Sequence, residues 1–198
     1  IVATNDGTVT VSGSTATYTP DSNFNGTDTF TYKANDGTVD SNTATATITV
    51  TAVNDAPTTS AVSASTNEDT AKAITLVGAD IDGDSLTYSI VSNPSNGSLG
   101  SVSGTSVTYT PTANWNGTDT FTWKANDGTV DSATGTVTIN VSAVNDVPVA
   151  SAVSASTNED TAKAITLSAT DVEGSSLTYS VVATNNGSVT VSGSTATY

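Results

Sequence analysis

A repeat of 91 residues is the feature that most constrains how this chain folds. The segment "YKANDGTVDS" at Tyr32 returns as "WKANDGTVDS" at Trp123, and "STNEDTAKAITL" at Ser65 returns unchanged at Ser156. "AVNDAP" returns as "AVNDVP" at the same spacing. Self-similarity at a fixed period indicates tandem copies of one structural unit. The sequence therefore predicts an array in which each unit buries its own core.

The register of the repeat predicts how the chain divides. Val2 to Tyr18 match Val182 to Tyr198. The last residues of the chain therefore belong to the same part of the repeat unit as the first residues. We interpret the chain as a window of a longer array. It would hold the C-terminal half of one unit at 1–54, a complete unit at 55–146, and the N-terminal half of the next at 147–198.

Short segments with alternating polarity recur between turn signals in the complete unit. In "TFTWKA", Phe121, Trp123 and Ala125 share one face, and "TVTINV" alternates in the same way. Alternation with period two predicts half-buried strands, and Asn-Gly pairs between them predict tight turns. About seven strands per unit predict an all-β fold of tandem immunoglobulin-like or cadherin-like β-sandwiches. The further core residues that we expect are Leu76, Leu86, Tyr88, Ile90, Val107, Tyr109, Val137, Ile139 and Val141.

The composition argues against several classes of function. Four Lys and Arg residues face 19 Asp and Glu residues, for a net charge of −15, so nucleic acid and anionic membranes are poor partners. His and Cys are absent, which removes the usual general base and thiol nucleophile. We therefore expect no enzyme. No apolar run approaches the roughly 18 residues that span a bilayer, so we expect no membrane insertion by this segment.

Three like charges crowd one loop of the complete unit. Asp80, Asp82 and Asp84 lie within five residues in "ADIDGDSLTYSI". Such neighbours repel one another unless a cation lies among them. Carboxylates with nearby carbonyl and amide oxygens suit Ca²⁺, which accepts irregular sets of six to eight oxygen ligands. The alternative is that these are solvated turn residues, because Asp favours turns for local reasons.

Four motifs together give the chain a family resemblance. "VNDAP", "NED", "ADIDGDSLTYSI" and "KANDG" resemble the cadherin-like tandem repeats of very large bacterial surface adhesins. In cadherins, the matching linker and aspartates bind calcium between successive domains. The resemblance implies a first Ca²⁺ site from Asn54, Asp55, Asp80, Asp82 and Asp127. It implies a second from Asn145, Asp146, Asp171 and Glu173, with Glu68 reaching toward it from the middle unit.

The chain departs from the cadherin pattern in ways that matter for affinity. At the second joint Glu173 replaces Asp82, and Ser175 replaces Asp84. The cadherin acidic triplet is replaced by "NFNGTD" and "NWNGTD", which leave only Asp28 and Asp119 nearby. Fewer carboxylates weaken calcium binding. We expect the second joint to bind fewer ions or to bind them less tightly.

These observations predict a mechanical function outside the cell. We expect calcium-rigidified extender repeats of a bacterial adhesin, at the cell surface or secreted, whose partners are neighbouring repeats of the same chain. Three alternatives stay open. In the first, complementary half units pair head to tail into a filament. In the second, Phe24 or Trp115 stacks on a glycan. In the third, a lysine forms an isopeptide bond, at the equivalent positions Lys33 and Lys124 or at Lys72 and Lys163.

Overall fold

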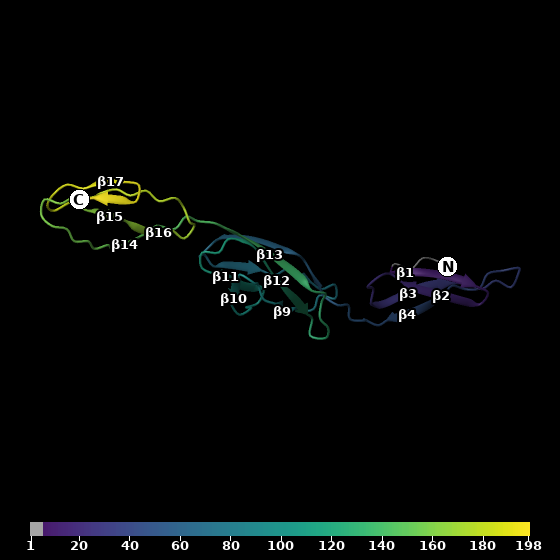
Figure 1. Ribbon diagram of the computed structural model, residues 1–198. Coiled ribbons are helices and arrows are strands. Elements are labelled where there is room, and N and C mark those ends of the chain that lie inside the picture. The colour runs from purple at the N-terminus through teal and green to yellow at the C-terminus, as the bar shows by residue number, and fades with distance from the viewer. Residues whose placement is uncertain (1–5) are drawn as a thin grey trace.

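The computed structural model describes residues 6–198, and every regular element within that range is a β-strand (Figure 1). Three portions follow one another, with β1–β4 in the first, β5–β13 in the second and β14–β18 in the third. The prediction of an all-β chain is confirmed. Residues 1–5, where the predicted match to the C-terminal segment begins, lie outside the described range. No helix long and apolar enough to cross a membrane is found among the described residues.

The middle portion is a two-layer sandwich. One sheet has the order β6-β13-β12-β9, in which β6 runs parallel to β13 and the other pairs are antiparallel. The second sheet has the order β10-β11-β7, and β5 pairs separately with β8. The strands are β5 (Thr58–Thr59), β6 (Val62–Asn67), β7 (Lys72–Thr75), β8 (Gly78–Ala79), β9 (Thr87–Ser92), β10 (Gly97–Leu99), β11 (Ser106–Pro111), β12 (Gly117–Asn126) and β13 (Gly135–Ser142).

The core lies between these two sheets. Phe121, Trp123 and Ala125 project inward from β12 and have no exposed surface, as their alternation predicts. The other buried members are Ile74, Leu76, Val107, Tyr109, Val137, Ile139 and Val141, while Leu86, Tyr88 and Ile90 are partly buried against them. Large apolar side chains from both layers thus give this unit a continuous core, and the predicted core residues are confirmed.

The outer portions contain fewer paired strands than the middle one. The first consists of two hairpins, β1 (Gly7–Ser12) with β2 (Thr15–Pro20) and β3 (Gly26–Tyr32) with β4 (Ala44–Val50). The third has the sheet β15-β18-β17 and the pair β14-β16. Its strands are β14 (Val149–Ser151), β15 (Ala164–Thr166), β16 (Ser168–Thr170), β17 (Thr190–Ser192) and β18 (Thr195–Thr197).

Segments without a partner strand stay irregular. Residues 153–158 and 178–183 correspond in the repeat to β6 and β9, yet they form no strand. In the middle portion β6 pairs with β13 and β9 pairs with β12, and the third portion has no counterpart of either partner. In the first portion, likewise, 46% of Tyr32 is exposed where its counterpart Trp123 is fully covered. The presence of a partner strand therefore decides which segments form strands, and the strands of the facing layer decide which side chains are buried.

Candidate metal centres at the joints

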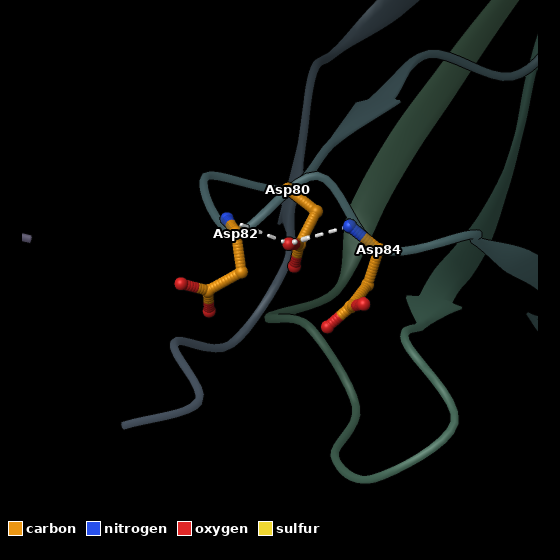
Figure 2. Close-up of side chains that lie close together, drawn as sticks. All are labelled: Asp80, Asp82 and Asp84. Carbon is orange, nitrogen blue, oxygen red and sulfur yellow. Dashed lines mark hydrogen bonds between the residues drawn. The ribbon is translucent and has the colours of Figure 1, made fainter. Parts of the chain in front are cut away.

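The acidic loop at the first joint gathers three carboxylates. It follows β8, and one carboxylate oxygen from each of Asp80, Asp82 and Asp84 lies within 4.8 Å of the other two (Figure 2). Oδ1 of Asp80 accepts the backbone N–H of Asp82 at 2.9 Å and of Asp84 at 3.2 Å. Asp80 therefore fixes the shape of the loop that presents the other two side chains.

The second oxygen of Asp80 lacks a hydrogen-bond partner. Oδ2 is buried and accepts no hydrogen bond from the described residues. A buried oxygen of a carboxylate is costly to leave unsatisfied, and two further carboxylates beside it raise that cost. A divalent cation would satisfy all three groups. The donor set, which consists of carboxylate oxygens only, fits Ca²⁺ better than the smaller Mg²⁺, which demands near-octahedral geometry.

The linker before the middle portion is tied to the same loop. The N–H of Asp55 donates to Oδ2 of Asp82 at 2.7 Å, and the side-chain amide of Asn54 donates to Oδ2 of Asp127 at 2.8 Å. The five residues predicted for the first joint thus lie at one pole of the middle sandwich. Asp84 joins them, and its place in the acidic cluster of the sequence was the signal for it.

Asp127 is held as a charged acceptor in the turn after β12. The Asn54 amide lowers the pKa of Asp127 below its ordinary value of 3.8, and the backbone N–H groups of Val130 and Thr129 lower it further. The carboxylate therefore stays ionised into acidic solution and keeps its negative charge at the joint. The position of Asn54 next to it depends on a contact across 73 residues of sequence.

The second joint has fewer contacts of this kind. The N–H of Asp146 donates to Oε1 of Glu173 at 3.3 Å, and Oδ1 of Asp171 accepts the N–H of Ser175 at 2.8 Å. The amide of Asn145 donates to the carbonyl of Asp146 and not to a carboxylate. The linker and the loop after β16 are thus brought together as at the first joint, but by a longer hydrogen bond and without a third acidic residue in the loop.

Glu68 anchors the second linker to the middle sandwich. Only 4% of Glu68 is exposed, and its Oε1 accepts the N–H of Val144 at 2.5 Å while its own N–H donates to the carbonyl of Ser142 at 2.9 Å. The residue lies where the sequence predicted, at the end of the middle unit beside the second joint. Its carboxylate stabilises the course of the linker, a role that the sequence did not indicate.

Asp119 is used inside the sandwich. It is 4% exposed, and its carboxylate accepts the N–H groups of Ser95 and Asn96 and the hydroxyl of Tyr109, at 2.8–3.1 Å. Asp28 is equally buried and accepts the hydroxyl of Tyr18 at 2.9 Å. The alternation of β12 offered a signal for this, because Asp119 shares a face with Phe121. Both carboxylates are satisfied by protein donors and not directed at the joints.

The structure bears on the glycan-stacking and isopeptide alternatives that the sequence left open. Trp115 is partly buried against the core, which leaves it little free surface for stacking on a sugar. Lys124 and Lys33 form ion pairs with Asp131 and Asp40, and all four side chains are substantially exposed. Isopeptide formation needs a buried lysine, so these two positions do not offer the required environment.

The sequence model of the bacterial Ig domain matches residues 1–51, 54–140 and 145–198. The chain therefore belongs to the bacterial Ig-like domain family. This agrees with the all-β sandwich of the middle portion and with the tandem arrangement. No curated protein matches the chain.

Several solved structures show distant likeness. The endo-fucoidan hydrolase MfFcnA4 of glycoside hydrolase family 107 is 22% identical with a TM-score of 0.35, over 72% of this chain and 23% of that one. Domains 1–6 of the surface layer protein SbsC are 19% identical with a TM-score of 0.35, over 96% and 26%. The chain thus spans about a quarter of the length of these structures. Likeness at this level carries no information about ligands or activity.

Proposed function

We propose that this chain is part of a calcium-rigidified stalk that extends a bacterial adhesin away from the cell surface. The observation that carries the proposal is the buried, unpartnered Oδ2 of Asp80 beside Asp82 and Asp84, at the pole where the linker enters the middle sandwich. Tandem bacterial Ig-like units supply length by repetition. The role is mechanical and not catalytic, and its partners are neighbouring repeats and not nucleic acid or membrane.

A bound cation would turn a flexible joint into a stiff one. Asp80, Asp82 and Asp84 would hold it. Asp55 is joined to this group by the hydrogen bond from its N–H to Asp82, and Asp127 is hydrogen-bonded to Asn54 of the linker. When bound, calcium supplies positive charge that offsets repulsion among these carboxylates and within a chain of net charge −15. Because the linker is hydrogen-bonded to the same loop, fixing the loop also fixes the direction of the linker.

The second joint would bind calcium more weakly. It relies on Asp146, Asp171 and Glu173, with Ser175 in place of a fourth carboxylate. Fewer charged ligands reduce calcium affinity. Calcium would therefore stiffen the two joints at different concentrations.

Small-angle scattering and thermal melts across a calcium titration, with a chelator arm, test the proposal. We expect calcium to narrow the range of particle shapes and raise the melting temperature, and Asp80→Asn with Asp82→Asn to remove both effects. Asp40→Asn is the matched control, since it removes an exposed carboxylate that precedes β4, at the end of that strand opposite the linker, and its ion pair with Lys33 contributes little. Equal shape and stability in calcium and chelator would refute the calcium-stiffened stalk.

Head-to-tail strand exchange is a second candidate function. A groove of about 630 Å³ in the first portion is lined by Phe30 and Tyr32. Within residues 6–198, β3 and β4 each pair with another strand along one edge only. Residues 153–182 carry the counterparts of the strands that cover this face in the middle unit. Exposed edges of this kind accept added strands. A second copy of the chain would supply them.

Engineered disulfides distinguish the two candidates. Thr138 pairs with Ser63 in the middle unit, and their counterparts are Thr47 and Ser154. Because the chain has no cysteine, Thr47→Cys with Ser154→Cys would give covalent oligomers only if copies exchange strands. Thr138→Cys with Ser63→Cys is the intramolecular positive control. Monomers in the first variant and a closed bridge in the second would rule out the exchange.

A further inference from the structure

Two loops of the middle sandwich meet at the pole that faces the second linker. Asp69 follows β6 and Asn114 follows β11, and the N–H of Asn114 donates to Oδ1 of Asp69 at 3.0 Å. Both residues have positive φ, +58° and +57°. Asp and Asn tolerate this conformation better than most residues. The contact fixes the two loops to each other and holds the Asn114 side chain at the end of the unit.

The side-chain amide of Asn114 lies between two carboxylates from different parts of the chain. With its nitrogen turned toward them, it is 3.3 Å from Oδ2 of Asp69 and 3.1 Å from Oδ2 of Asp146. An amide group carries two N–H donors, and the hydrogen-bond surroundings decide which way it is turned. One side chain can therefore serve both carboxylates at once, and Asp146 belongs to the linker.

We propose that Asn114 is a positioning residue that ties the second linker to the middle sandwich without any cation. Its two N–H donors join Asp69 on the pole to Asp146 on the linker and offset the repulsion between the two carboxylates. Hydrogen bonds to charged acceptors are stronger than those between neutral groups. The inference rests on the proposed stalk function, because it explains how a joint with fewer cation ligands stays directed.

The first joint lacks the equivalent tie. Asn23 is the counterpart of Asn114 and has the same positive φ, +60°. Within residues 6–198 the side-chain amide of Asn23 makes no hydrogen bond, although Asn23 and Asp55 line the same surface pocket. The two joints therefore differ in kind. The direction of the first linker depends on the acidic loop, whereas the second linker is also held by the hydrogen bonds of Asn114.

Distances between spin labels across each joint test this inference. Thr108→Cys with Thr166→Cys spans the second joint and Thr47→Cys with Thr108→Cys spans the first. All three positions are exposed strand positions of a chain without cysteine. In chelator we expect a narrower distance distribution across the second joint than across the first. Asn114→Asp, which replaces both donors by an acceptor, should abolish the narrow distribution, whereas Asn23→Asp should leave the first joint unchanged.

A second variant distinguishes loss of the Asn114 hydrogen bonds from misfolding of the loops. Asp146→Ala removes the linker partner and lies outside the sandwich, so it should also abolish the narrow distribution in chelator while the middle unit melts as in the parent. An unchanged second-joint distribution in both variants would overturn the inference. So would a distribution across the second joint of the parent that is broad in chelator and narrows only with calcium, because a cation and not Asn114 would then hold the linker. The tie is measured in chelator, so its loss is distinguishable from a failure of calcium to stiffen the first joint.

Discussion

At the scale of single residues, the carboxylates differ by the donors that surround them. Asp119 is buried, and protein donors satisfy its carboxylate. One oxygen of Asp80 accepts hydrogen bonds, whereas the other is buried and accepts none from residues 6–198. Asp127 is exposed, and an amide and two backbone N–H groups hold its charge. The first kind stabilises the fold, and the other two lie at the pole of the sandwich where we propose that a cation binds.

Removing the buried carboxylate should destabilise the middle unit. Asp119→Ala leaves the N–H groups of Ser95 and Asn96 without an acceptor and the hydroxyl of Tyr109 with only the carbonyl of Asn96, at a cost of about 3 kcal/mol in the free energy of unfolding. Denaturant unfolding measures it, with the exposed Asp131→Ala as control. A loss no larger than that of the control would contradict the assignment.

The same variant has a signature at alkaline pH. Burial, and then the hydrogen bond and charge of Asp119, raise the pKa of Tyr109 from 10.0 to about 12. Because the pKa is raised in the folded state, the stability that this interaction contributes is present below pH 10 and is lost as the pH rises through about 12. Asp119→Ala should lower this pKa toward its ordinary value in an ultraviolet titration.

At the scale of elements, a segment of this chain forms a strand only where a partner strand lies beside it. The sequence "SLTYSIV" forms β9 next to β12, while the nearly identical "SLTYSVV" at 176–182 is irregular. Backbone N–H and C=O groups need the ladder of a neighbouring strand, and alternation of side chains does not supply it.

Adding the missing partners should therefore create strands. When a copy of residues 110–144 is appended after Tyr198, it supplies counterparts of β12 and β13, and we expect slow hydrogen exchange at 153–158 and 178–183. A copy of residues 55–89 has the same length and supplies neither partner, so it is the control. Equally fast exchange in both chains would show that these segments have no latent strand pairing.

At the scale of the whole molecule, charge repulsion acts on joints between separate units. A net charge of −15 over three portions favours an expanded chain. Salt screens exposed charges in general, whereas a bound ion acts only at its ligands.

Salts of different cations should separate these two effects. In chelator, rising NaCl should reduce the scattering dimensions gradually. Calcium should act at far lower concentration, and magnesium less than calcium, because the acidic loop suits a larger ion with irregular oxygen ligands. Scattering titrations measure these responses, with the ionic strength held constant when calcium and magnesium are compared. Identical responses to calcium and magnesium would show screening and no specific site.

The sequence alone determined the repeat, the strand alternation, the core around Trp123 and the acidic loop at Asp80, because each of these is a local pattern. It also located the linkers. Only the tertiary structure decided the rest, since it depends on contacts between distant segments. Asn54 meets Asp127 across 73 residues, and Asn114 meets both Asp69 and a linker aspartate. Which alternating segments become strands was likewise decided by the presence of a partner, because strands are stabilised in pairs and not singly.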